Sequence, residues 1–388
     1  MQEFNNTEIA FSSKSKKELK RAYWLFKAIE KQWIVSFGNK MLAFALLIRF
    51  PIKWILKPTI FKHFCGGETI AECNHTINEL GKSNIGSILD FSAEGNNNES
   101  DFDYVMNEIK EVIETSKTNR FIPFAVFKVT GLARIQLLEK INSKLELTIS
   151  ESDEFKKVQK RIDTICNSAF HAELPVFIDA EESWIQDTID MLAIQMMEKY
   201  NHKNAIVYNT IQLYRNDRID FLNKSIEKAK AQHYFVGFKL VRGAYMEKER
   251  ERALSLGYSS PIHVSKEFTD KDYNKALEIC IAHSDIVSIC AGSHNEESNR
   301  LLTILINKNS FSKNDKKFYF AQLLGMSDHI SFNLSHEGYK VAKYVPFGPV
   351  KSVLPYLIRR AQENTSIAGQ TGRELNLIES ELKRRKMQ

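Results

Sequence analysis

The chain has 388 residues, of which 43% are hydrophobic and 26% are charged, and its formal net charge is +6. This composition is typical of a globular protein and excludes a disordered chain and a membrane-embedded body. The charge excess is small and dispersed, which argues against a nucleic-acid partner, and the length suits one barrel of about 250 residues with an extension.

Residues 1–80 are predicted to form a helical arm. A stripe of apolar residues at helical spacing lies among lysines and arginines and comprises Leu19, Tyr23, Phe26, Ile29 and Trp33. This amphipathic helix is expected to pack on the protein, and an anionic membrane surface is the alternative partner. Charged residues and prolines interrupt the apolar stretch 41–61, which is therefore not expected to cross a bilayer.

The cysteines and the N-terminus predict the compartment. The five cysteines are odd in number and show no CxxC spacing, which indicates a reducing environment. The first residues do not resemble a secretory signal, and their acidic residues do not suit a mitochondrial transit peptide. We therefore expect a protein of the bacterial cytoplasm, with any membrane contact peripheral and on the inner face of the plasma membrane.

Eight apolar runs rich in Val, Ile, Phe and Tyr occur within residues 81–365. The runs are 85–91, 121–129, 174–179, 205–213, 235–241, 286–291, 318–322 and 341–346. Most are separated by enough residues for a helix, which favours parallel crossovers over hairpins. An open doubly wound sheet is the alternative, but the sequence has no GxGxxG or GxxxxGK[ST] turn. We predict an α/β fold, a (βα)8 TIM-type barrel, followed by a solvated helical tail at 366–388.

A polar residue stands near the carboxyl end of each run. These residues are Asp90, Lys128, Asp179, Gln212, Arg242, His294, Gln322 and Tyr344. A (βα)8 barrel builds its active site from the loops at this end of the strands. One polar strand end usually only solvates its strand, whereas eight of mixed character indicate a single site.

The segment KLVRGAYMEKERERA, residues 239–253, leaves a predicted strand and enters a charged helix. Lys239 and Arg242 are suited to hold a phosphate or polarise an acceptor. Gly243 would let the backbone approach a ligand, and Tyr245 could stack on a ring. The alternative is a sharp turn with solvated basic residues.

The segment YVPFGPVKSVLPYLIRRAQEN, residues 344–364, passes from a strand into a helix with adjacent Arg359 and Arg360. Neighbouring helical residues point about 100° apart, so both arginines reach one ligand only if the helix lies across it. Guanidinium groups bind carboxylates bidentately, and Glu363 is spaced to orient Arg359. An exposed patch is the alternative, but the apolar neighbours indicate a partly buried helix, which needs an anionic partner.

Three further residues are candidates for the site. Asp179, in VFIDAEESW with Glu181, could balance the arginines or position a substrate amine. Lys128 could form an ion pair or act as a Schiff-base nucleophile. His294 is expected to form hydrogen bonds, and no metal site is predicted because no HxH or HExxH spacing accompanies it.

These three segments, together with NTIQLYRND and QLLGMSDHISFNL, closely resemble the proline dehydrogenase family, particularly its eukaryotic-like monofunctional branch. The resemblance spans essentially the whole barrel. It implies a distorted (βα)8 barrel that binds FAD non-covalently at its carboxyl face. It also implies oxidation of L-proline to Δ1-pyrroline-5-carboxylate, with electrons passed to a membrane quinone.

The resemblance also implies roles for individual residues. On the substrate side, the carboxylate of proline would be held by Arg359, Arg360 and Lys128. The proline ring would be walled by Tyr344 and Tyr356. Asp179 and Glu363 would orient these substrate-binding residues. The flavin would be lined by Gln212, Lys239, Arg242, Gly243, Ala244, Tyr245 and His294, with Lys239 near flavin N5. Many bacterial relatives carry Arg in place of Lys239 and Lys in place of Arg242, so the total charge is retained.

Alternative activities remain. Hydroxyproline dehydrogenase is the nearest, but family members of that type carry a smaller residue where Tyr344 stands, which favours proline. A Schiff-base lyase or aldolase built on Lys128 or Lys239 is another, and a non-catalytic membrane-associated module is a third. The chain lacks room for an aldehyde dehydrogenase domain, so a separate pyrroline-5-carboxylate dehydrogenase is expected to consume the product.

Overall fold

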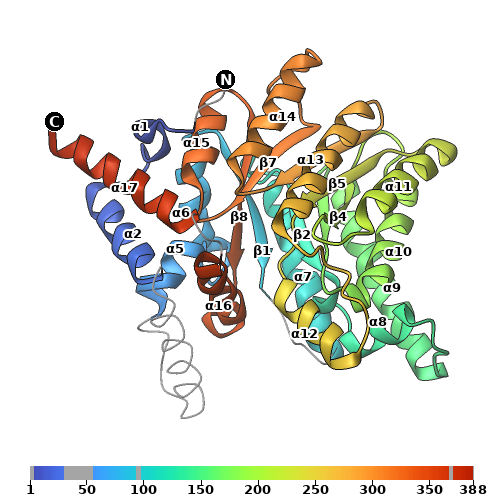
Figure 1. Cartoon of the computed structure of the whole chain (residues 1–388). Coiled ribbons are helices and arrows are strands. Elements are labelled where there is room, and N and C mark those ends of the chain that lie inside the picture. The colour runs from blue at the N-terminus through green and yellow to red at the C-terminus, as the bar shows by residue number, and fades with distance from the viewer. Residues whose placement is uncertain (1–3, 30–55, 93–97, 367–369, 388) are drawn as a thin grey trace, which may run out of the picture.

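The computed structural model describes residues 4–29, 56–92, 98–366 and 370–387, with only the backbone at residues 29, 361–366, 370 and 371. Its centre is a closed barrel of eight parallel strands in chain order (Figure 1). The strands are β1 (Ile85–Phe91), β2 (Ala125–Lys128), β3 (Val176–Asp179), β4 (Val207–Gln212), β5 (Val236–Val241), β6 (Val287–Gly292), β7 (Phe318–Leu323) and β8 (Lys340–Phe347). The predicted (βα)8 barrel is confirmed.

Helices follow the strands and cover the outside of the barrel (Figure 1). They are α7 (Glu99–Ser116), α8 (Ile135–Asn142), α9 (Ile149–His171), α10 (Ser183–Tyr200), α11 (Arg218–Gln232), α12 (Met246–Leu256), α13 (Lys266–Ala282), α14 (Glu296–Lys308), α15 (Asp328–His336) and α16 (Val350–Ser366). Five strands begin one to four residues later than predicted, and two of these, β2 at Ala125 and β3 at Val176, begin just after Pro123 and Pro175. Proline has no N–H to donate to a strand ladder, which explains the later starts of β2 and β3.

The barrel has two apolar layers because successive strand residues point to opposite faces. The inner layer includes Phe124, Phe177, Tyr208 and Tyr344, with the rings of Phe124 and Phe177 stacked 4.3 Å apart. The outer layer lies between strands and helices and forms the largest core cluster. Burial of both faces explains why the strands appear in the sequence as nearly continuous apolar runs.

The described segments before the barrel, residues 4–29 and 56–84, are largely helical, as predicted. They are α1 (Thr7–Ala10), α2 (Lys16–Ile29), a π-helical turn at Lys57–Phe61, α5 (Lys62–Phe64) and α6 (Ile70–Gly81). Helix α2 lies beside the last helix, α17 (Gln370–Met387), as Figure 1 shows on its left side. Trp33 and most of the apolar stretch 41–61 lie outside the described residues.

The prediction of a solvated C-terminal tail is wrong. Leu377 and Ile378 of α17 are buried in one cluster with Leu19 and Phe26 of α2. Arg385, in the terminal basic run, donates hydrogen bonds to the carbonyl oxygens of Phe11 and Lys14. The domain boundaries at residues 80 and 365 stay predictions. Within the described ranges, no helix combines the length and the apolar character needed to cross a membrane.

Candidate active site

Three polar side chains from three different strands meet inside the barrel. Asp179 ends β3, Lys239 lies on β5 and Tyr344 lies on β8. Lys239 Nζ donates to Asp179 Oδ1, and the Tyr344 hydroxyl donates to Asp179 Oδ2. Lys239 Nζ also lies 3.4 Å from the Tyr344 hydroxyl. The structure therefore brings together three of the predicted site residues, which are far apart in the sequence.

These three residues are almost completely shielded from solvent. Asp179 is 8% exposed, Lys239 6% and Tyr344 9%. A charge removed from water needs a partner, and Lys239 and Asp179 supply opposite charges to each other. Burial, and then the charge of Asp179, hold the pKa of Tyr344 well above its ordinary value, so the phenol stays protonated and donates. The Lys239 ammonium also lies 4.6 Å from the centre of the Tyr344 ring.

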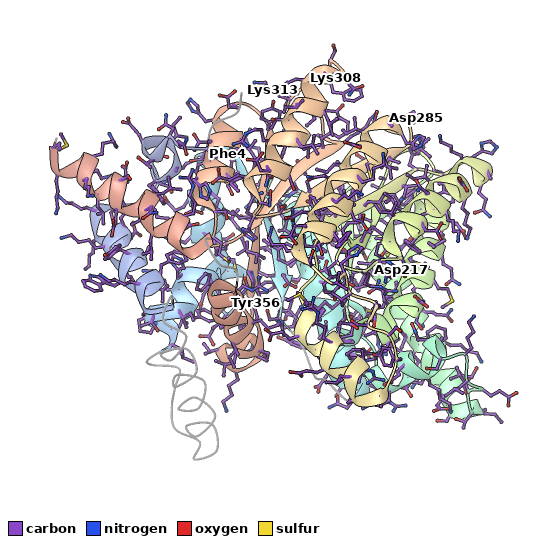
Figure 2. All side chains as sticks on the ribbon, viewed as in Figure 1. Phe4, Asp217, Asp285, Lys308, Lys313 and Tyr356 are labelled. Atoms are coloured by element: carbon purple, nitrogen blue, oxygen red, sulfur yellow. The ribbon has the colours of Figure 1, made fainter. Side chains whose placement is uncertain are left out.

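Helix α16 carries the two predicted arginines near the ends of β8 and β1, where Figure 2 labels Tyr356. Tyr356 and Arg360 are both 7% exposed, and the Arg360 guanidinium lies 5.1 Å from the Tyr356 ring centre. Arg359 lies 6.0 Å from the ring of Tyr245, in the turn after β5. The partly buried helix predicted from the sequence is observed. The side chain of Glu363 lies outside the described residues.

Arg242, directly after β5, is held by neighbouring elements. Its guanidinium donates to Asp270 Oδ1 at 2.7 Å, Ser293 Oγ at 2.7 Å and Ser298 Oγ at 2.9 Å. It also lies 4.4 Å from the ring centre of Tyr273. These contacts fix the orientation of the cation, and two of the five guanidinium N–H groups are not used in them.

The structure gives a reason for glycine at position 243 that differs from the predicted close approach of the backbone to a ligand. The φ of Gly243 is +132°, and a Cβ there would lie 2.6 Å from the ring of Tyr214. Glycine is therefore required for the backbone conformation and for the packing of Tyr214. Ala244 is exposed and Tyr245 half-buried in the same turn.

Gln212 and His294 lie at the carboxyl ends of β4 and β6. Gln212 is 2% exposed, and its Oε1 accepts no hydrogen bond from any described residue. His294 Nδ1 lies 2.9 Å from Ser327 Oγ. Burial, followed by the charges of Lys343 and Arg360, lowers the pKa of His294 to about 3, so its imidazole is neutral at neutral pH.

A second carboxyl group lies beside Asp179. Glu181 is 3% exposed and accepts hydrogen bonds from Thr130 N, at 2.9 Å, and from Thr130 Oγ1. Burial raises the pKa of Glu181 to about 7, against the opposing effect of the Thr130 hydrogen bonds. Lys128 ends β2 directly opposite Asp179 in the strand register. The turns after β2 and β3 are therefore joined at the site.

Not every polar strand end belongs to this group. Gln322 Nε2 donates to the carbonyl oxygen of Ser293 at 3.0 Å, and its Oε1 accepts from Ser331 Oγ at 2.8 Å. Asp90 is 4% exposed at the end of β1, opposite Pro346 of β8. Gln322 therefore holds neighbouring turns together, in contrast to the expectation that all eight strand ends form one site.

Comparison with known proteins identifies the family. The sequence model of the proline dehydrogenase family matches residues 73–373. The chain belongs to the proline dehydrogenase family. It is 32% identical to "Proline dehydrogenase 1, mitochondrial" of Dictyostelium discoideum, and the match covers 98% of this chain and 74% of that one. It is 30% identical to "Hydroxyproline dehydrogenase" of Xenopus laevis, over 97% of this chain and 88% of that one.

The fold is also found among solved structures. Proline utilization A from Bdellovibrio bacteriovorus, inactivated by N-propargylglycine, superposes with a TM-score of 0.73 at 19% identity. The match covers 93% of this chain but only 38% of that one, so this chain spans well under half of that relative. At this identity the likeness shows that the two share the fold.

Within this proline dehydrogenase fold, sequence reasoning missed two residues that shape the site. Thr130 holds Glu181, and the Tyr214 ring packs against Gly243. Tyr214 follows a strand and is aromatic, which is a usable signal, but its contact with a glycine in the next strand's turn depends on tertiary structure. Thr130 carries no comparable signal in the sequence.

Proposed function

We propose that this chain oxidises L-proline to Δ1-pyrroline-5-carboxylate with FAD as its cofactor and passes the electrons to a quinone. The observation that carries the proposal is the buried contact of Lys239 and Tyr344 with Asp179 inside the barrel of a proline dehydrogenase family member. A (βα)8 barrel builds its active site at the carboxyl ends of its strands, and Asp179 ends β3.

The residues present fit a flavin. The buried Oε1 of Gln212, which no described residue donates to, is a suitable acceptor for an N–H group of the flavin ring. Lys239 would place a positive charge beside flavin N5, where a cation stabilises the reduced form. Arg242 keeps N–H groups for an anionic phosphate, and neutral His294 would serve as a hydrogen-bonding partner. FAD would supply the chemistry of hydride acceptance and onward electron transfer.

On the substrate side, cations would hold the carboxylate of L-proline. Arg360 and Arg359 come from α16 and Lys128 from β2, so the carboxylate would be held from two sides of the barrel. Tyr344 and Tyr356 would wall the ring, and Asp179 would orient Lys239 and Tyr344. Positioning of this kind contributes to rate because the reacting carbon is held next to its acceptor.

Glu363 would complete this set by orienting Arg359, four residues earlier on the same helix. Ala244, Gly243 and Tyr245 would line the flavin through the turn after β5. The electron acceptor would be a membrane quinone that is met at the surface of the bilayer from the cytoplasm. The product would pass to a separate pyrroline-5-carboxylate dehydrogenase.

Hydroxyproline is the second candidate substrate, because a relative that covers nearly the whole chain is named hydroxyproline dehydrogenase. Tyr344 favours proline because its ring occupies the inner layer of the barrel and its hydroxyl is engaged with Asp179. A lyase based on Lys239 is disfavoured, since a Schiff-base nucleophile must be an uncharged amine and Lys239 is ion-paired.

The test is an absorption spectrum of the purified protein, loaded with FAD, before and after anaerobic addition of L-proline. We expect flavin bands that bleach with L-proline and much less with trans-4-hydroxy-L-proline. Preferential bleaching by hydroxyproline would transfer the assignment to that substrate. A protein that takes up no FAD, or whose flavin neither compound reduces, would contradict the proposal.

A further inference from the structure

One buried carboxylate joins the turn after β5 to the turn after β3. Glu249 lies on α12, one helical turn beyond Tyr245, and its side chain is fully buried. Its Oε1 accepts from the backbone N–H of Ser183 at 2.6 Å, and its Oε2 accepts from Ser183 Oγ at 2.6 Å. Both oxygens are therefore bound to the first residue of α10.

The position that Glu249 occupies is the N-terminus of a helix on another part of the chain. Glu182, the residue before α10, makes no capping hydrogen bond with its side chain. The first N–H groups of a helix lack partners within it, and this end carries a partial positive charge that favours a carboxylate. Glu249 thus caps α10 from α12.

Neighbouring contacts strengthen the junction of α12 and α10. Lys248 forms an ion pair with Glu182, and the Arg252 guanidinium lies 4.3 Å from the ring centre of Trp184. The Lys248 and Arg252 side chains are 57% and 31% exposed, so solvent weakens their charge interactions. Glu249 is fully shielded and carries the strongest part of the junction.

This junction spans strands that are not neighbours. Strand β4 separates β3 from β5, so no strand ladder connects the two turns. Tyr214, from the turn after β4, contacts the turn after β5, since its backbone N–H donates to the Arg242 carbonyl oxygen at 2.7 Å and its ring packs against Gly243. Burial, and then the charge of Glu249, hold the pKa of Tyr214 well above its ordinary value. Glu249 therefore closes a set of three consecutive turns at the carboxyl face.

We infer that Glu249 is a positioning residue, which holds the turn of Gly243 and Tyr245 against the end of β3 that carries Asp179. The inference rests on the proposed function in one respect, namely that this turn lines the flavin. Without the Glu249 carboxylate, α12 keeps only the partly exposed contacts of Lys248 and Arg252 with the start of α10, and the turn that precedes α12 is held less firmly. The chain should then bind FAD more weakly.

The test compares Glu249→Gln with Glu251→Gln, which removes the same charge from an exposed position on the same helix. A glutamine at 249 keeps the size and an acceptor for the Ser183 N–H, but it removes the negative charge at the N-terminus of α10 and the charged acceptor of Ser183 Oγ. We measure FAD affinity of the apoprotein by flavin fluorescence, and tryptic cleavage within 246–256 without flavin. We expect Glu249→Gln to raise the Kd for FAD about tenfold and to speed cleavage, with neither change in the control.

Several outcomes would overturn the inference. An unchanged FAD affinity in folded Glu249→Gln, even with a lower unfolding temperature, would assign Glu249 a purely structural role. If that variant does not fold, Ser183→Ala removes one of the two bonds and should raise the Kd about threefold, and no change there would contradict the account. A wild-type protein that binds no flavin would instead refute the proposed function. In that case, cleavage that is faster in Glu249→Gln than in wild type and in Glu251→Gln would still show that Glu249 holds α12 against α10.

Discussion

Two buried lysine–aspartate pairs occupy opposite sides of the barrel wall. Lys239 pairs with Asp179 inside the barrel, beside Tyr344. Lys343 pairs with Asp328 outside it, at 2.9 Å, between β8 and α15. Lys343 precedes Tyr344 in β8, and neighbouring strand residues point to opposite faces, so β8 supplies the lysine of the outer pair and the Tyr344 hydroxyl that donates to Asp179 of the inner pair.

The two pairs differ in how their hydrogen-bonding groups are used. Lys343 Nζ also donates to the carbonyl oxygens of Met326 and Leu323, and Asp328 also binds Lys14 of the N-terminal segment at 3.1 Å. The second pair therefore connects a strand, a helix and the N-terminal arm. Lys239, in contrast, contacts a carboxylate, a phenol and aromatic rings inside the barrel. Burial and charge alone do not distinguish a candidate active site from a structural junction, whereas the hydrogen-bonding partners of the buried lysine do.

The largest expected effect is on activity, from Asp179→Asn. The change leaves Lys239 buried without its opposite charge and removes the charged acceptor of Tyr344. Removing a preorganised electrostatic contact from an active site typically lowers the rate by about a hundredfold or more, so we expect at least roughly a hundredfold loss of kcat/KM. Steady-state oxidation of L-proline with a soluble quinone analogue measures it. Activity within tenfold of wild type would place the pair outside the reaction.

Lys343→Met should instead reduce stability. Asp328 would keep Lys14 but lose its fully buried partner, and we expect the free energy of unfolding to fall by about 3 kcal/mol. Urea unfolding measures this change. Lys14→Met is the matched variant, and since the Lys14 side chain is 27% exposed it should cost clearly less. Equal unfolding curves for Lys343→Met and wild type would contradict a structural role.

Glu181 differs from the two paired aspartates because Thr130, rather than a lysine, donates to its two carboxylate oxygens. Its pKa is about 7 in the folded protein, above about 4.3 in the unfolded chain. The folded state binds more protons, so this group's contribution is intact below about pH 4 and stability falls as pH rises to about 7. Glu181→Gln should remove that fall, on the order of 2 kcal/mol between pH 5 and pH 8 by urea unfolding. An unchanged pH dependence would refute the assignment.

The smallest expected effect comes from Tyr344→Phe. The ring remains in the inner layer, but Asp179 loses one hydrogen bond. A hydrogen bond to a charged group contributes about 1.5–3 kcal/mol, so we expect roughly a tenfold loss of kcat/KM for L-proline. Tyr339→Phe is the control, because its hydroxyl contacts Asn307 outside the barrel. Similar losses in both variants would indicate a general effect on the fold.

Much of the fold could be predicted because strands buried on both faces appear as apolar runs, although several strands start one to four residues later than predicted, two of them after Pro123 and Pro175. The convergence of Asp179 and Tyr344 followed from their predicted places near strand ends in a closed barrel, whereas Lys239 was singled out by the basic segment 239–253 and the family resemblance. Which strand-end residues face the site could not be predicted, because it depends on the partners each one finds.

Two long-range contacts could not be predicted because their residues lie in charged or polar stretches of the sequence. Glu249 lies in the run MEKERERA, where a solvated helix is the simplest interpretation, and its burial depends on the placement of α10. The packing of α17 on α2 was missed for a similar reason, since the few apolar residues of the tail include Leu377 and Ile378 among many charges. Long-range contacts of this kind leave little trace in local spacing.

The most direct test of the distinction between the two pairs is the rate of flavin reduction by L-proline in a single anaerobic turnover. Wild type, Lys239→Met and Lys343→Met are compared at a temperature at which all three are folded and loaded with FAD. We predict that Lys239→Met slows reduction at least a hundredfold, as expected when a charge beside the reacting atoms is removed, while Lys343→Met stays within about twofold. Equal slowing of the two variants would contradict the assignment of the inner pair to the active site.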